Sequence, residues 1–86
     1  MTNVTTTDMT TIYDRVHAIV VRELAIEPDF VKRESHLVDD LGADSFGSIC
    51  ISQAIEEEFG IEISTPEIKT MHMVVDIVDL VAGKLT

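Results

Sequence analysis

The stretch from residue 39 to residue 60 reads DDLGADSFGSICISQAIEEEFG and contains the point at which a loop becomes a helix. Apolar residues recur at helical spacing after Asp44, which predicts a helix from Ser45 to Phe59. Its apolar positions are Phe46, Ile49, Ile51, Ala54, Ile55 and Phe59. Gly60 is typical of the residue that ends a helix in a left-handed conformation. Gly42 offers a position without Cβ constraints just before the helix.

A second helical pattern lies on the N-terminal side of this stretch. Its apolar residues share one face of a helix, at Met9, Ile12, Tyr13, Val16, Ile19, Val20 and Leu24. Asp8 or a neighbouring threonine can cap the start of this helix. Pro28 marks its end, because the residue before a proline is pushed out of the helical conformation. Residues 1–7 are polar and rich in threonine, and we expect them to fray.

The C-terminal side predicts one short helix and one longer helix. Thr65-Pro66-Glu67 is a helix-start pattern with Pro66 at the first helical position, and this helix should run to about Thr70. The last helix is predicted from about Met73 to Lys84. Its expected buried residues are Val74, Ile77, Val78, Val81 and Leu85. The segment IEIS, residues 61–64, alternates like a strand but has no partner strand, so it is interpreted as extended loop.

A long connection, residues 27–44, joins the first two main helices. It is longer than most loops between helices, so it is either functional or held in place by its own apolar side chains. The candidates for that anchoring are Phe30, Val31, Leu37, Val38 and Leu41. The predicted fold is therefore all-α: an up-down bundle of three main helices plus one short helix, with a long first loop, in a single domain over residues 1–86.

The charge of the chain is concentrated in its middle. The formal net charge is −10, and residues 34–68 carry nine acids and no Lys or Arg. Such a surface repels nucleic acid and anionic lipid and attracts basic protein patches, although it also serves solubility alone. The N-terminus lacks the basic and apolar regions of a signal peptide, and no apolar run is long enough to span a bilayer, so a cytoplasmic protein is expected.

Two further properties bear on the class of protein. A chain of 86 residues has little room for a deep cleft with its own catalytic set, which favours a module on which other enzymes act. Cys50 is the only cysteine, so neither an intrachain disulfide nor a thiolate metal cluster can form. His17, His36 and His72 are scattered, which argues against a metal site, and the acids around Asp40 do not have the spacing of a calcium loop.

Ser45 is the residue at which chemistry is expected. It lies where the loop becomes a helix, and the positive end of a helix stabilises an anion, so a phosphodiester on its hydroxyl would be favourably placed. The simpler interpretation is that Ser45 is only an N-cap, which contributes about 0.5–2 kcal/mol to a helix. A hydrolytic triad around Ser45 is not expected, because the G-x-S-x-G elbow and its sheet are missing.

LGADSF, residues 41–46, followed by AIEEEFGIEI, residues 54–63, closely resembles the attachment motif and second helix of acyl carrier proteins of the bacterial fatty-acid and polyketide type. The similarity spans roughly residues 8–85. It implies that Ser45 accepts 4′-phosphopantetheine from coenzyme A in a reaction run by a holo-acyl-carrier-protein synthase. It also implies that Asp44 helps that synthase to hold its divalent metal, and that the thiol of the arm carries acyl groups as thioesters.

The resemblance further implies a non-catalytic carrier, acting as a monomer, whose second helix is recognised by basic patches on acyl-transfer and chain-elongating enzymes. The residues that match this expectation are Asp39, Asp40, Glu56 and Glu57, together with Asp44 and Glu58. The chain departs from the family pattern at Phe46, Gly47, Cys50 and Gln53, where a leucine, an acid, an acid and an apolar residue are common. These departures leave the attachment site intact but put partner choice in doubt, and they suggest a specialised carrier.

Two alternatives stay open on the sequence. An acidic helical adaptor would bind basic partners without a prosthetic group and would not need Ser45. An aminoacyl or peptidyl carrier would share the arm but carry a different cargo. The L-G-A-D-S form and the strong acidity favour the acyl type.

Overall fold

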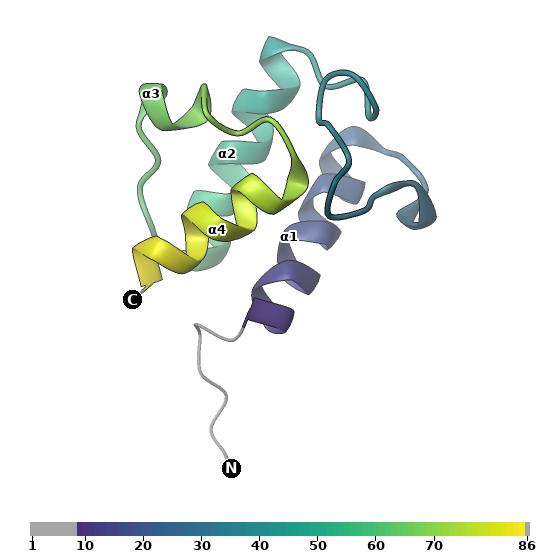
Figure 1. Ribbon diagram of the computed structural model, residues 1–86. Coiled ribbons are helices and arrows are strands. Elements are labelled where there is room, and N and C mark those ends of the chain that lie inside the picture. Colours follow the sequence, from purple (N-terminus) through teal and green to yellow (C-terminus); the bar gives the residue numbers. More distant parts are fainter. Residues whose placement is uncertain (1–8, 86) are drawn as a thin grey trace.

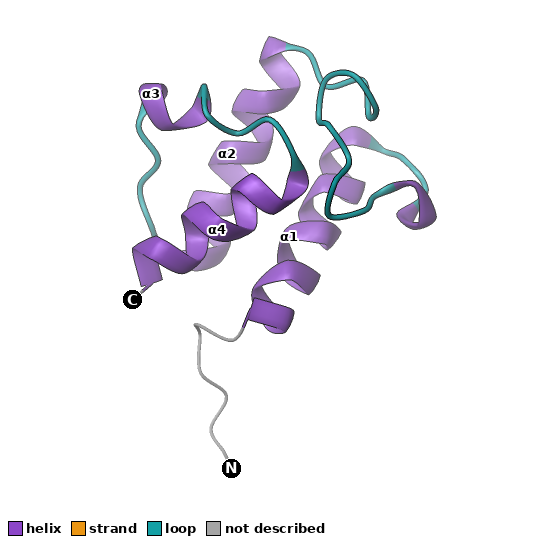
Figure 2. Ribbon diagram, in the orientation of Figure 1, coloured by secondary structure: helices purple, strands orange, loops and turns teal. Residues whose placement is uncertain are grey.

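A computed structural model describes residues 9–85 of the chain. Its elements are α1 (Met9–Leu24), the 3-10 turn η1 (Pro28–Phe30), α2 (Ser45–Phe59), α3 (Thr65–Ile68) and α4 (Val74–Leu85) (Figure 1). Helices and loops make up this part of the chain, without a β-strand (Figure 2). The predicted all-α bundle of three main helices and one short helix is therefore confirmed. The predicted fraying of residues 1–7 and the cap at Asp8 lie outside the described residues.

The core lies where α1 packs against both α2 and α4. Its fully buried side chains are aliphatic, which fits a chain without Trp and with few aromatic residues. They are Ile12, Val16 and Val20 of α1, Ile51 and Ile55 of α2, Leu37 of the long loop, and Val74, Ile77, Val78 and Val81 of α4. Among the described residues, no helix is both long and apolar enough to cross a membrane.

Two of the apolar residues of α2 lie on its exposed face. Phe46 is 74% exposed and Ile49 is 45% exposed, so neither is a core residue. The buried face is set by Ile51 and Ile55, and a helix turns about 100° per residue. Phe46 therefore lies roughly 140° from Ile51 around the helix axis and Ile49 roughly 160°, on the side away from α1. Gly60 ends α2 with φ of 66°, as predicted.

The long loop is anchored by fewer residues than predicted. Val31 and Leu37 are buried and Leu41 is partly buried, but Phe30 is 68% exposed and Val38 52% exposed. Phe30 ends the single 3-10 turn, in which successive side chains point about 120° apart, so only the following Val31 faces the core. Backbone N–H groups of Val74 and Val75 donate to carbonyls of the loop residues Ser35 and Arg33. The loop thus provides hydrogen-bond acceptors for the first two N–H groups of α4.

The two C-terminal helices begin and end close to their predicted limits. Thr65 is the first residue of α3 and Pro66 the second, because Ser64 takes the cap position in a reciprocal pair of hydrogen bonds with Glu67. The helix start predicted at Pro66 was therefore one residue late. Met73 precedes α4 and forms an isolated antiparallel bridge with His36. This bridge brings the long loop and the segment before α4 together at one end of the bundle.

Candidate functional site

The start of α2 is capped by Asp44 and not by Ser45. Asp44 has an extended backbone, and its Oδ1 accepts a 2.7 Å hydrogen bond from the N–H of Gly47. Ser45 is the first helical residue. The interpretation of Ser45 as the N-cap is therefore wrong, because the carboxylate one residue earlier already satisfies the third N–H of the helix.

The hydroxyl of Ser45 is exposed and makes no hydrogen bond within residues 9–85. It lies at the end of the helix where free N–H groups and the helix dipole stabilise negative charge. Its backbone is positioned by the preceding loop: Gly42 has φ of 76°, and the N–H of buried Ala43 donates to the carbonyl of Leu37 at 2.8 Å. The loop thus holds one unengaged hydroxyl at the positive end of a helix.

Gly47, one of the departures from the family pattern noted in the sequence, has a local structural role. A Cβ at this position would lie 3.3 Å from Oδ1 of Asp44 and 3.5 Å from a methyl carbon of Leu24. Both distances are tight or close contacts, and the capping carboxylate would have to move slightly to accept a larger residue. Gly47 therefore allows the short hydrogen bond that fixes Asp44.

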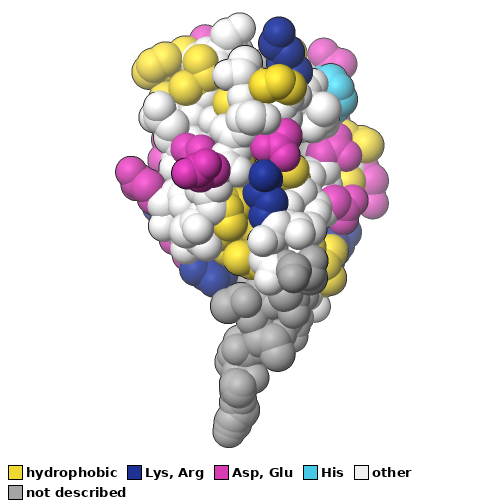
Figure 3. All heavy atoms as spheres, turned by 90° about the vertical axis from the view of Figure 1, so that its left-hand side faces the viewer, with side chains coloured by type: hydrophobic (Ala, Val, Ile, Leu, Met, Phe, Trp, Pro, Cys, Tyr) yellow, Lys and Arg dark blue, Asp and Glu magenta, His cyan; other side chains and the backbone are white. Residues whose placement is uncertain are grey.

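A groove of about 370 Å³ adjoins Ser45. Its apolar lining comes from Val38 of the long loop, Ile49 of α2, Ile68 of α3 and Met71. Lys69 and His72 also line it, and no acid does. Figure 3 shows the face that carries α3, where apolar side chains gather at the upper end beside basic and histidine side chains. The exposure of Ile49 and Val38 is explained by their position on this groove.

The comparisons with known proteins agree with this geometry. A family model described as "Phosphopantetheine attachment site" matches residues 14–81. The chain is 38% identical over 72 residues to an acyl carrier protein of Campylobacter fetus subsp. fetus, covering 84% of the chain and 94% of the relative. It is also 38% identical over 74 residues to an acyl carrier protein of Thermosynechococcus vestitus, covering 86% and 91%. The chain belongs to the acyl carrier protein family.

Membership implies a covalently attached 4′-phosphopantetheine group, and this acyl carrier protein has the features that such an arm requires. Ser45 offers an exposed hydroxyl without a competing partner, and the groove beside it has apolar walls and room for a chain. The arm supplies a thiol that carries an acyl group as a thioester. The adaptor and the aminoacyl or peptidyl carrier receive no support from the comparisons.

The acids predicted to contact partners lie at the two ends of α2. At its start, Asp39, Asp40 and Asp44 are exposed, and Oδ2 of Asp40 accepts the N–H of His36 at 2.7 Å. At its end, Glu57 is exposed, and its carboxylate makes no ion pair or hydrogen bond within residues 9–85. These positions are compatible with contact to a partner, which stays a prediction.

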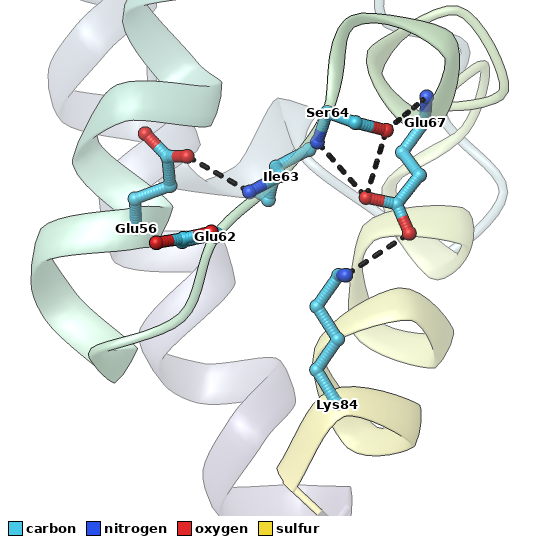
Figure 4. A pocket seen from close by; sticks show the side chains of 6 residues that line it. All are labelled: Glu56, Glu62, Ile63, Ser64, Glu67 and Lys84. Carbon is cyan, nitrogen blue, oxygen red and sulfur yellow. Dashed lines mark hydrogen bonds and ion pairs between the residues drawn. The ribbon is translucent and has the colours of Figure 1, made fainter.

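Glu56 and Glu58 have structural partners that the sequence did not indicate. Glu56 is half-buried, and its Oε2 accepts the N–H of Ile63 at 2.8 Å, which ties the loop after α2 back to the helix (Figure 4). Glu58 forms a 2.8 Å ion pair with Arg15 of α1. Of the three consecutive glutamates, Glu57 is therefore the best placed for recognition by another protein.

The pocket drawn in Figure 4 is polar and separate from the groove at Ser45. Oε1 of Glu67 accepts the N–H of Ser64 at 2.9 Å, and Oε2 lies 3.0 Å from Nζ of Lys84. The backbone N–H of Ser64, helped by Lys84, lowers the pKa of Glu67. These contacts fix α3 to α4. The polar groups of this pocket therefore have a structural role.

Two histidines that are far apart in the sequence, His36 and His72, lie close together beside the groove. The ring centroids of His36 and His72 are 6.0 Å apart, and their planes are 28° from parallel. The bridge between His36 and Met73 brings them together, and a sequence pattern does not encode such a contact. No group of three or more potential metal ligands occurs within residues 9–85.

Cys50 and Gln53, two further departures from the family pattern, line a shallow recess of about 200 Å³ beside the end of α1. Glu57 lines the same recess, with Arg22 and Glu23 of α1. The recess is polar, so the face that a partner would meet here differs in chemistry from the apolar groove at Ser45.

Proposed function

We propose that Ser45 carries the phosphopantetheine arm of this acyl carrier protein. The observation that supports the proposal best is the hydroxyl itself, which is exposed at the first turn of α2 and free of structural duty because Asp44 supplies the cap. On attachment, Oγ of Ser45 gives up its proton and forms an ester bond with the pantetheine-side phosphorus of coenzyme A. The phosphoanhydride bond breaks, and adenosine 3′,5′-bisphosphate leaves. The helix N-terminus favours the resulting negative phosphodiester.

Asp44 is proposed to help the holo-synthase hold its divalent metal during this transfer. Its Oδ1 is engaged by Gly47, and a carboxylate has further lone pairs for a hard cation. One residue would thus both begin the helix and mark the attachment site.

The carrier itself is proposed to be non-catalytic and to work as a cytoplasmic monomer. It would deliver acyl groups among enzymes of fatty-acid, polyketide or specialised lipid synthesis, with basic patches of those enzymes contacting Asp39, Asp40, Glu56 and Glu57. Tethering raises the effective concentration of the acyl group at each active site without adding catalysis. The carboxylate of Glu56 already accepts a hydrogen bond from the N–H of Ile63. We therefore expect Glu56 to contribute less to such contacts than Glu57.

Intact mass spectrometry tests the attachment site. After incubation with coenzyme A, Mg²⁺ and a promiscuous holo-synthase, wild type should gain the mass of one phosphopantetheine group. Ser45→Ala should gain nothing while keeping its helical circular dichroism, because the Ser45 hydroxyl has no hydrogen-bond partner in residues 9–85. Ser48→Ala, which changes the neighbouring serine on the same groove, should be modified like wild type. Full modification of Ser45→Ala would exclude this assignment.

A further inference from the structure

Lys69 differs from the other basic residues of the chain. The chain has six Lys and Arg residues, all of which the structure describes. Five have a partner for the charged group: Arg15 with Glu58, Arg22 with Glu23, Lys84 with Glu67, Lys32 with the carbonyl of Asp29, and Arg33 with the ring of Tyr13. The ammonium of Lys69 has no ion pair or hydrogen bond within residues 9–85.

The position of Lys69 makes this unpaired charge significant. It directly follows α3, is exposed, and lines the groove that Ser45 also lines. Asp39, Asp40 and Asp44 are exposed at the start of α2, so this part of the surface around Ser45 repels an anion. The groove, lined by Lys69 and His72 and by no acid, is the exception.

We propose that Lys69 binds the phosphodiester of the arm and so holds the arm along this groove. The inference rests on the proposed attachment at Ser45, which fixes a negative group at one edge of the groove. The ammonium provides a charge of opposite sign, and Val38, Ile49, Ile68 and Met71 provide apolar walls for the rest of the arm. Lys69 thereby shifts the arm from an extended position towards one folded against the protein.

The size of the effect follows from the exposure of Lys69. An exposed ion pair contributes at most about 1 kcal/mol, which changes the ratio of folded-back to extended arm by at most roughly fivefold. Salt should weaken the pair, because the Debye length falls from about 30 Å at 0.01 M to about 8 Å at 0.15 M. The arm should therefore be less protected at high ionic strength.

The reactivity of the arm thiol measures this equilibrium. We suggest preparing the phosphopantetheinylated protein with Cys50→Ala, so that the arm carries the only thiol, and alkylating it with neutral iodoacetamide. At low salt, Lys69→Gln should react roughly two- to fivefold faster than the parent protein. At high salt the two rates should converge. Lys32→Gln is the matched control, since Lys32 contacts the carbonyl of Asp29 and does not line the groove, and it should react like the parent.

Amide NMR gives a second readout that does not depend on the thiol. Attachment of the arm should shift the resonances of Ile68 and Met71 at low salt, and Lys69→Gln should reduce those shifts. Equal alkylation rates and equal shifts in the parent and Lys69→Gln would overturn the role of Lys69, as would an equal acceleration in Lys32→Gln. Failure of wild type to gain the mass of the arm would instead overturn the attachment itself, so the two failures are distinguishable.

Discussion

Asp44 caps the start of α2 with one carboxylate oxygen, which accepts a 2.7 Å hydrogen bond from the N–H of Gly47. Asp44→Asn should keep this cap, because asparagine caps helices about as well as aspartate, but it removes the charge proposed to hold the metal. We therefore expect slower phosphopantetheinylation with little change in the urea midpoint. Asp44→Ala should lose both the helix cap and the carboxylate charge, and loss of the cap should lower the free energy of unfolding by about 1 kcal/mol. Modification of Asp44→Asn at the wild-type rate, measured by mass spectrometry over time, would leave Asp44 as a cap only.

At the residue scale, the sequence predicted that Ser45 begins a helix, but it did not identify the residue that caps this helix. The position of Ser45 at a loop-to-helix boundary was predictable from the spacing of apolar residues after it, and the structure confirms that boundary. The sequence did not predict the cap at Asp44 or the hydrogen bond between Glu56 and the N–H of Ile63. Both depend on side-chain geometry across several residues. Charge runs in a sequence do not distinguish such bound carboxylates from exposed ones.

Elements with a single apolar face were predicted best. α1 and α4 bury or partly bury the apolar residues that their spacing indicates, because each packs one face against the bundle and leaves the other in water. The exception is Met9, the first residue of α1, which is 43% exposed. α2 also has apolar residues outside its core face, of which Ile49 lines the groove beside Ser45, and spacing alone does not show that Phe46 and Ile49 are exposed. Of the residues expected to anchor the long loop, Phe30 and Val38 are exposed, because apolar content does not say which side a turn presents.

The attachment of α3 to α4 should depend on pH through Glu67. Folding lowers the pKa of this carboxyl, chiefly through the N–H of Ser64, so its contribution to stability is present above the unfolded-state pKa and is lost as pH falls through the folded-state value. Glu67→Gln should therefore be less stable than wild type at neutral pH, with the difference shrinking in acid. Urea unfolding at neutral and acidic pH checks this. A difference that stays constant with pH would show that the Glu67 charge is not responsible.

At the scale of the whole molecule, the net charge of −10 should guide the approach of basic partners. Glu57→Lys should slow phosphopantetheinylation by a holo-synthase with a basic docking surface by roughly twofold to fivefold at low salt, and less at high salt. Glu56 is unsuitable for this test because its carboxylate binds Ile63. Glu27→Lys, an exposed change of the same charge outside residues 34–68, is the control and should have a smaller effect. Equal slowing in both variants would mean that net charge, and not the end of α2, sets the rate.

Phe46 adds a consequence for how this protein behaves when concentrated. The ring of Phe46 lies next to Ser45 and is 74% exposed, so it offers an apolar contact to a second molecule. Any two copies that met ring to ring would also crowd the aspartates at the start of α2 against one another. Repulsion between these aspartates thus opposes self-association through Phe46. A positively charged enzyme is not repelled and can still contact the same exposed ring.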